Sequence, residues 1–283
     1  MGNKVYIGVD LGATNVRSGR VASGQLIQHY NQALPKNKQI ENVINAITTA
    51  IEAVWDKTVV AIGIGVPSVV DRKTGVVYHV QNIPDWEEIA LKQILEDKHG
   101  IPVFVNNDAN CFALGEKHFG VGKPFDHFVG LAIGTGVAGG IIQNGKLLKD
   151  VNCGSGEFGE MCYLDSKFEN YCSGLFFHLQ HQTNAKTVFE QSRLGNQDAL
   201  AISNAFAVHL GKLLKTIVCA IDPEAIVIGG SVAKGHDVFH APMMQEFCLF
   251  PYPKSIEKLQ IIYNTKSENQ VLGAAYLAAD AEV

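Results

Sequence analysis

The sequence has no feature of an exported or membrane-bound protein. Its first ten residues, MGNKVYIGVD, contain neither the charged region nor the apolar region of a signal peptide, and they do not fit the myristoylation pattern. No run of about 18 apolar residues suggests a membrane span. We therefore expect a cytoplasmic protein that has no membrane partner.

Cysteine clusters and excess positive charge are also missing. The six cysteines are widely spaced and form no CxxC pair, so we expect free thiols and no zinc site. His178 and His181 are three residues apart, which an ordinary surface helix explains better than a metal does. The net charge of -5 gives no basic surface for nucleic acid, so an anionic nucleotide must be bound by backbone N–H groups and a metal ion.

The apolar residues that are present follow the periods of an α/β protein, and 283 residues are enough for two domains. Short apolar runs predict strands at residues 4–10, 15–22, 25–32, 59–66, 102–105, 128–133, 137–143, 225–228 and 259–263. Helical spacing predicts helices at residues 39–55, 86–99, 111–118, 199–221 and 269–279. Both halves open with a strand, a glycine tip and a second strand, which predicts a duplicated α/β unit with a cleft between the copies.

Three glycine-rich tips follow apolar strands, namely DLGAT at residues 10–14, Gly134-Thr135-Gly136 and Gly229-Gly230. Glycine allows the backbone to approach a ligand and to point consecutive N–H groups at it. In the first tip Gly12 supplies that freedom, Thr14 adds a hydroxyl, and Asp10 adds a carboxylate that can hold Mg²⁺ directly or through water. Glycines also end strands that bind nothing, but three such tips favour a triphosphate site.

Two common nucleotide motifs are excluded. Residues 134–139 match the dinucleotide pattern GxGxxG, but that pattern must open a helix. Here Ile141, Ile142 and an Asn144-Gly145 hairpin signal follow, so the tip joins two strands. The GxxxxGK[ST] pattern of P-loop enzymes does not occur.

Two stretches carry candidate catalytic or binding side chains. Asp108, between a predicted strand and a predicted helix, could take the proton of an attacking hydroxyl, and Asn107 could position that hydroxyl. A helix N-cap is the alternative explanation of this motif, and taken alone it is the stronger one. Glu157, Glu160 and Glu169 could accept hydrogen bonds from sugar hydroxyls, or could be ordinary acidic residues of a solvated loop.

The ordered set of motifs resembles the ROK family of bacterial sugar kinases, within the hexokinase–actin–Hsp70 ATPase superfamily. Residues 10–17 resemble its first phosphate motif, residues 133–140 the second and residues 226–232 the adenosine motif. Residues 107–110 resemble the catalytic segment, and residues 156–159 and 169–174 resemble the sugar-binding stretches. Single motifs are weak signals, but this set runs in the family's order over nearly the whole chain.

The resemblance implies an α/β fold of duplicated actin-like ATPase (ribonuclease H-like) domains, with residues 1–111 plus 268–283 in the first and residues 112–267 in the second. It implies that Asp108 is the general base toward a hexose hydroxyl, usually O6. The other implied roles are hexose binding by Asn107, Glu157 and Glu169, phosphate binding by Gly12, Thr14, Gly134, Thr135 and Gly136, a place for Asp10 near Mg²⁺, and adenosine binding by Gly229 and Gly230.

The chain departs from the family at its sugar stretch. Most members have a histidine after Gly-Glu-x-Gly that touches the sugar and binds a structural zinc with three cysteines. Here Glu160 takes that position and Cys162 is the one cysteine near it, so we predict no zinc. If Glu160 faces the sugar, four carboxylates share a pocket and at least one pKa is raised; alternatively Glu160 turns outward.

These observations predict an ATP-dependent kinase that phosphorylates a hexose, most simply glucose. The alternatives are a kinase for allose, mannose, fructose or an N-acetylated amino sugar, and a sugar sensor without turnover. The intact phosphate motifs argue against the sensor. A homodimer is an expectation from the family alone.

Overall fold

The structure is a computed structural model that describes residues 1–2, 4–80, 83, 86–266 and 268–281. Contacts divide the chain into two compact units. The first unit comprises Met1–Pro124, Gly140–Ser155 and Ser267–Val283, and the second comprises Phe125–Gly139 and Gly156–Lys266. The domain boundaries that the resemblance implies stay a prediction.

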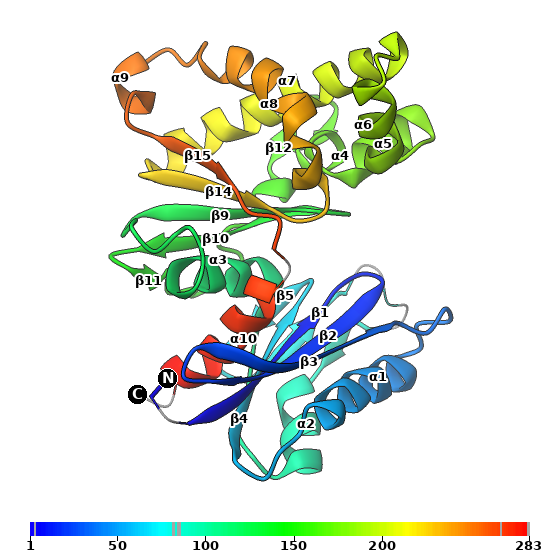
Figure 1. The fold of residues 1–283 in the computed structure, drawn as a ribbon, viewed down its shortest axis with the longest axis vertical. Helices are drawn as coiled ribbons and strands as arrows, with labels where there is room; N and C mark the ends of the chain where they lie inside the picture. Colours follow the sequence, from blue (N-terminus) through cyan, green and yellow to red (C-terminus); the bar gives the residue numbers. More distant parts are fainter. Residues whose placement is uncertain (3, 81–82, 84–85, 267, 282–283) are drawn as a thin grey trace. The chain divides into compact units, whose positions relative to one another are not determined.

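The first unit is built on a five-stranded sheet with the order β3-β2-β1-β4-β8 (Figure 1). Strands β1 to β3 form the predicted antiparallel meander, whereas β1, β4 and β8 are parallel neighbours. Parallel strands place their carboxyl ends at one edge of the sheet. The bounds are β1 Val5–Leu11, β2 Asn15–Ala22, β3 Gln25–Ala33, β4 Val59–Val66 and β8 Val103–Asn107.

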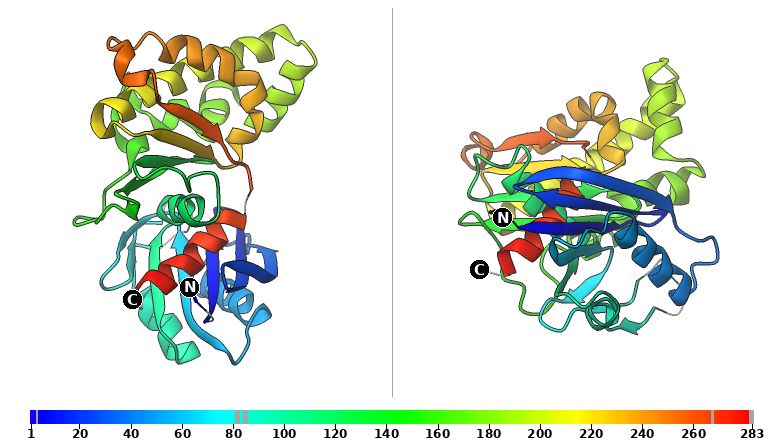
Figure 2. Two further views of the ribbon diagram at one scale, coloured as in Figure 1. Left: turned by 60° about the vertical axis from the view of Figure 1, so that its left-hand side comes forward. Right: turned by 60° about the horizontal axis from the view of Figure 1, so that its bottom comes forward.

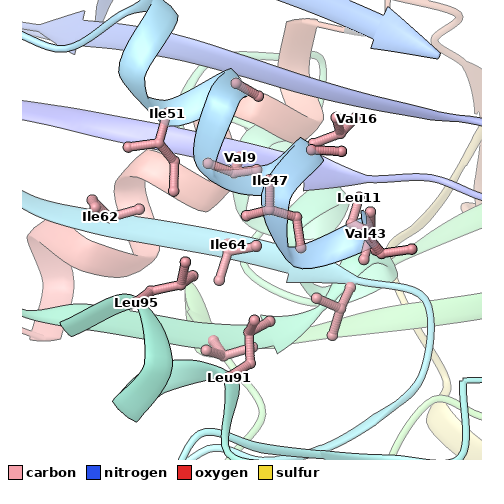
Figure 3. Close-up of a cluster of buried hydrophobic side chains, with 14 of the residues drawn as sticks. Val9, Leu11, Val16, Val43, Ile47, Ile51, Ile62, Ile64, Leu91 and Leu95 are labelled. Carbon is pink, nitrogen blue, oxygen red and sulfur yellow. The ribbon is translucent and has the colours of Figure 1, made fainter. Parts of the chain in front are cut away.

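Helices cover both faces of this sheet. On one face, α1 (Ile40–Ala53) and α2 (Leu91–His99) pack against the strands, because the apolar residues at steps of three and four on α1 form a stripe. Figure 3 shows this core, in which Ile47 and Ile51 of α1 lie over Ile62 and Ile64 of β4. On the other face lies α10 (Glu268–Ala281), which also contacts α3 (Asp108–His118).

Helix α10 (red in Figure 2) lies beside the sheet and α3, and its backbone approaches them unusually closely. A Cβ atom added at Gly63 of β4 would lie 1.8 Å from the Ala274 carbonyl oxygen of α10. Glycine at Gly8, Gly115 and Gly273 is required in the same way, since a Cβ atom at each would meet backbone within 1.9 Å. The absence of these side chains therefore lets backbone pack against backbone.

One predicted helix is wrong over its first half. The prediction was a helix at residues 86–99, but the helix α2 begins at Leu91, and Glu88–Ile89 form β7. Strand β7 pairs with β6 (Val76–Tyr78), which pairs with β5 (Val69–Asp71), so a small antiparallel sheet precedes the helix. Trp86 is buried at 2% exposure in the core beneath α1, so tertiary burial overrides the helical spacing of its segment.

The second sheet repeats the topology of the first, with the order β11-β10-β9-β14-β15. Its strands are β9 (Phe128–Ile133), β10 (Val137–Gln143), β11 (Lys146–Leu147), β14 (Ala225–Gly229) and β15 (Gln260–Tyr263). Strand β14 is parallel to β9 and β15, and β10 and β11 pair across the predicted Asn144-Gly145 turn, where both residues have positive φ. The predicted duplication is thus confirmed at the level of strand order.

The second unit also contains helices and one short hairpin. The predicted helix at residues 199–221 is α7, and α6 and α8 pack against it. The hairpin is β12-β13, which lies between the short helices η1 and α4 in the sequence. The bounds are η1 Phe158–Glu160, β12 Cys162–Tyr163, β13 Ser166–Lys167, α4 Glu169–Cys172, α5 Gly174–His181, α6 Ala185–Arg193, α7 Gln197–Ile221, η2 Val232–Gly235, α8 His236–Phe247 and α9 Pro253–Ile256.

Helix α7 is the one helix among the described residues whose length and composition would allow it to cross a membrane. Its apolar stretch is 44% buried inside the protein, including Phe206, Leu210 and Leu213. That pattern is typical of a core helix. The six cysteines are all free, as predicted, and two of them, Cys111 and Cys172, are buried.

A buried carboxylate fixes the start of α10 to the end of α3. Glu116 is 0% exposed, and its carboxylate accepts hydrogen bonds from the Asn269 side-chain amide at 2.8 Å and from the Val121 backbone N–H at 3.0 Å. Since Glu116→Ala would remove the acceptor of the Val121 N–H and leave the buried Asn269 amide without this acceptor, we expect it to lower the free energy of unfolding by about 2 kcal/mol. Urea denaturation measures this change. A matched control is Glu190→Ala, whose ion pair with Lys186 is exposed, and equal stability of the two variants would contradict the expectation.

Candidate functional site

The carboxyl edge of the first sheet brings three predicted site residues together. Asp10 on β1 pairs in register with Gly65 on β4, and Gly65 pairs with Asn106 on β8. Asn107 and Asp108 follow directly, at the junction of β8 and α3. Asp10 and Asn106 are almost one hundred residues apart in the sequence, but they lie at the same level of the sheet, with Gly65 between them.

Asp10 forms an ion pair with Arg17, a residue to which the sequence motifs assigned no role. Its carboxylate is 2.5 Å from a guanidinium nitrogen of Arg17, its cross-strand partner on β2. Burial raises the pKa of the Asp10 carboxyl, and the positive charge of Arg17 opposes that shift. Arg17 also donates to the Gln270 side chain at 3.2 Å. The hairpin register was the signal that could have identified this pair, because Asp10 and Arg17 flank the first tip symmetrically.

The N-cap of α3 is Asn107, not Asp108. The Asn107 side-chain oxygen accepts from the backbone N–H groups of Ala109 at 2.8 Å and Asn110 at 3.4 Å, and its amide donates to the Ser68 carbonyl at 3.2 Å. Asn107 therefore takes the capping role that was the alternative explanation of this motif. Asp108, the candidate base, is the first residue of the helix. The asparagine fixes where α3 begins and hence where Asp108 stands.

Gly65 provides the space beside Asp108. A Cβ atom at Gly65 would lie 3.3 Å from the Asp108 Cα and 3.1 Å from the Cys111 sulfur. Burial raises the pKa of the Cys111 thiol well above its usual value, and the negative charges of Asp10 and Asp108 raise it further. The negative charges of Asp10 and Asp108 therefore both disfavour the thiolate of Cys111, which agrees with their position at one edge of the sheet in the first unit.

The first glycine tip joins β1 to β2, as predicted. The Gly12 backbone N–H donates to the Asn15 carbonyl at 2.8 Å, and the Thr14 hydroxyl accepts from the Asn15 side chain at 2.9 Å. Thr14 is exposed. The tip is thus a tight turn with an accessible hydroxyl at its end.

The two glycine tips of the second unit lie side by side. Gly229 pairs with Ala132 on the neighbouring strand, and Gly230, with φ of 90°, lies so close to Ile133 that a Cβ atom would be 2.2 Å from its carbonyl oxygen. Gly134 follows Ile133, and its N–H donates to Gly136 at 2.9 Å. Thr135, at the centre of this turn, is exposed, and the turn leads into β10, so the rejection of a dinucleotide fingerprint is confirmed.

The acidic stretch packs against the Gly134–Gly136 tip. Glu169 opens α4, and one of its carboxylate oxygens accepts from the Val137 backbone N–H at 3.3 Å. The N–H of Gly174 donates to the Gly134 carbonyl at 2.8 Å. The structure therefore brings the predicted sugar-binding stretch and the predicted phosphate-binding tip into direct contact within one unit.

Glu157 precedes the short helix η1 and Glu160 is its last residue, and the Glu160 N–H donates to the Glu157 carbonyl at 3.1 Å. The Glu160 side chain is 51% exposed and forms an ion pair with Lys167, so of the two orientations that the sequence left open it adopts the solvent-facing one. Lys167 was missed in the sequence, although a single lysine between three glutamates could have suggested a counter-ion. A sugar-binding role for Glu160 stays a prediction.

The donor set of the first unit fits Mg²⁺ better than it fits zinc. Mg²⁺ is usually held by one or two carboxylates together with waters and substrate phosphates, and Asp10 is a buried carboxylate at the end of a strand. Within the described part of the chain, no group of three or more His, Cys, Asp or Glu side chains is arranged to hold a metal ion. The expectation that zinc is absent stays a prediction.

Comparisons with known proteins agree with this geometry. The model of a family described as the ROK family matches residues 6–281. A glucokinase from Thermotoga maritima is 29% identical over 95% of this chain and 95% of that protein, and a xylose repressor from Bacillus subtilis is 28% identical over 78% and 61%. The solved structure of a ROK family glucokinase from Streptomyces griseus, in complex with glucose and AMPPNP, covers 98% of this chain and 99% of that one with 27% identity and a TM-score of 0.85.

Proposed function

Because the chain belongs to the ROK family, we propose that it is an ATP-dependent kinase that phosphorylates a hexose, with O6 of glucose as the first candidate acceptor. The predicted actin-like α/β fold is confirmed by the similarity to a kinase of that fold over nearly the whole chain. The observation that carries the proposal is the pair of carboxylates, Asp10 and Asp108, at one edge of the first sheet.

In this proposal Asp108 is the general base. It accepts the proton of the sugar hydroxyl while the hydroxyl oxygen forms its bond to the γ-phosphorus and the bond from that phosphorus to ADP breaks. Capping of α3 by Asn107 supports this role, because it fixes the helix on which Asp108 stands. Asp10 would hold Mg²⁺ through its carboxylate or a bound water. A bound Mg²⁺ neutralises charge on the phosphates.

The glycine tips supply the phosphate contacts of the proposal. Gly12, Thr14, Gly134, Thr135 and Gly136 would direct backbone N–H groups and hydroxyls at the phosphates. Both threonines are exposed, which supports this assignment. Gly229 and Gly230 would lie against the adenosine, for which the lack of side chains leaves room.

The hexose contacts come from acceptor side chains. Glu157 and Glu169 would accept hydrogen bonds from sugar hydroxyls, and Asn107 would assist through its amide group. The contact of Glu169 with the glycine tip supports this arrangement, since the proposed sugar ligand would then lie beside the proposed phosphate ligands. Glu160, at 51% exposure, is the least supported of the proposed sugar contacts.

The proposal is tested by ADP release in a coupled assay over a panel of glucose, mannose, fructose, allose and N-acetylglucosamine. We expect turnover that requires both ATP and a hexose, with glucose among the best substrates. Turnover with a sugar other than glucose alone would change the proposed substrate but leave the proposed reaction intact. Tight binding of a sugar without phosphorylation of any hexose would favour a sensor instead, a role to which the similarity to a xylose repressor gives some weight.

A further inference from the structure

A lysine lies between two of the glutamates of the sugar stretch. The Lys167 ammonium on β13 is 2.5 Å from a Glu160 oxygen and 3.3 Å from a Glu169 oxygen. Lys167 and Glu169 are 28% and 12% exposed, whereas Glu160 is 51% exposed. Lys167 therefore bridges a solvent-facing carboxylate and a mostly buried one.

The buried partner is held from its other side as well. The second carboxylate oxygen of Glu169 accepts from the Val137 N–H at 3.3 Å, and a Cβ atom at Gly136 would lie 2.3 Å from that oxygen. One oxygen thus faces the glycine tip and the other faces Lys167. Together these two contacts fix the plane in which the carboxylate can accept further hydrogen bonds.

The hairpin that carries Lys167 is itself anchored. Tyr163 on β12 stacks on Phe168 with ring centroids 4.2 Å apart, and its hydroxyl is 2.9 Å from a ring nitrogen of His209 on α7. The Phe168 N–H donates to the Met161 carbonyl at 3.0 Å. The hairpin is therefore attached to the core helix of the second unit, and the position of Lys167 is set by packing.

Lys167 also compensates the negative charges of Glu160 and Glu169. Partial burial by itself lowers the pKa of the Lys167 ammonium, but the hydrogen bond with Glu160 and the charge of Glu169 outweigh it and hold the pKa above its usual value. Without the ammonium, two carboxylates would face each other, and like charges favour protonation of one of them. A protonated carboxyl group loses part of its capacity to accept hydrogen bonds.

We propose that Lys167 is a positioning residue for the hexose: it holds the Glu169 carboxylate against the glycine tip, ionised and oriented toward a sugar hydroxyl, with Glu160 as the counter-ion on the solvent side. This inference rests on the proposed function, because it takes Glu169 to be a sugar ligand. It goes further because it identifies Lys167, which is absent from the predicted site residues, as the positive charge that positions Glu169.

The experiment compares Lys167→Met with Lys167→Arg, because methionine keeps the apolar stem and arginine keeps the charge. We expect Lys167→Met to raise the KM for hexose about tenfold, the size of one lost charge-assisted hydrogen bond, with a smaller change in kcat. Lys167→Arg should stay within about threefold of the wild type. A matched control is Lys186→Met on α6, where the lysine is 83% exposed and 3.9 Å from Glu190.

The pH profile separates positioning from loss of structure. In Lys167→Met the acidic limb of kcat/KM should move to higher pH, because two neighbouring carboxylates without their shared counter-ion favour protonation of one of them. In Lys167→Met combined with Glu160→Gln the limb should return toward the wild-type position. The other titratable side chains on α4, and on or next to the elements packed against it, are unchanged in every variant; they are Glu157, Tyr171, Cys172, His178, His181, Asp198, His209, Lys212, Lys215 and Cys219.

A wild-type KM and an unmoved acidic limb in Lys167→Met would overturn the inference and leave the proposed function intact. The same holds if the double variant shows no recovery. Calorimetric measurement of hexose binding separates the two proposals. If the wild type binds a hexose without phosphorylating it, the kinase proposal fails, while about tenfold weaker binding by Lys167→Met would still support the positioning role.

Discussion

Replacement of Asp108 by asparagine is expected to reduce kcat for hexose phosphorylation by about a thousandfold, within the usual range for loss of a general base. Asparagine has nearly the same shape as aspartate, and the N-cap of α3 is the neighbouring Asn107, so the helix should still begin at the same residue. The KM for the sugar should change little, because the lost interaction is proton transfer in the transition state.

Two measurements together check this expectation, namely ADP release under saturating substrates and calorimetric binding of the hexose. Asp97→Asn is a matched control. Asp97 is an exposed residue near the end of α2, and its carboxylate accepts a hydrogen bond of 2.7 Å from the Gln93 side chain on the same helix. Full turnover in Asp108→Asn would reject the base assignment. Loss of turnover together with loss of sugar binding would show that Asp108 acts in binding instead.

Gly63→Ala is expected to have the largest effect on stability, lowering the free energy of unfolding by about 3 kcal/mol or more. The added methyl group would lie 1.8 Å from the Ala274 carbonyl oxygen and 2.7 Å from its carbon. These atoms are backbone of α10, so relief requires the whole helix to move away from β4. Such a movement also weakens the packing of α10 on β1 and α3.

Thermal and urea denaturation measure the effect of Gly63→Ala. The matched control is Gly154→Ala, at an exposed position where the nearest atom to an added Cβ is 3.9 Å away. We expect that control to stay within about 0.5 kcal/mol of the wild type. A Gly63→Ala protein as stable as the control would mean that α10 does not lie on β4 at this distance.

The strands were predictable because their apolar runs are short and bounded by glycine or turn residues. The residues of β4, β9 and β10 agree with the sequence prediction at both ends. The start of α2 was not predictable, because Trp86 is buried in a core cluster most of whose members are distant from it in the sequence. The helices α6 and α8 were not predicted either.

The residues of the candidate site were predictable from the sequence, but the ion pairs that they form were not. Asp10 lies near the end of β1 and Asp108 directly follows β8, and the parallel pairing of both strands with β4 brings the two residues to one edge. The ion pair of Asp10 with Arg17 required the hairpin register, and that of Lys167 with Glu169 required the packing of an irregular stretch. The N-cap that the sequence offered as an alternative explanation of residues 107–110 is Asn107.

The place of α10 in the first unit has a consequence for how the protein is made. Residues 268–281 leave the ribosome after the whole second unit, yet their backbone fills one face of the first sheet at Gly8 and Gly63. During translation that face has no helix on it, so the unit that is synthesised first is completed last. A released chain truncated before residue 268 should therefore contain all of the second unit but an incomplete first one, with apolar surface open to chaperones.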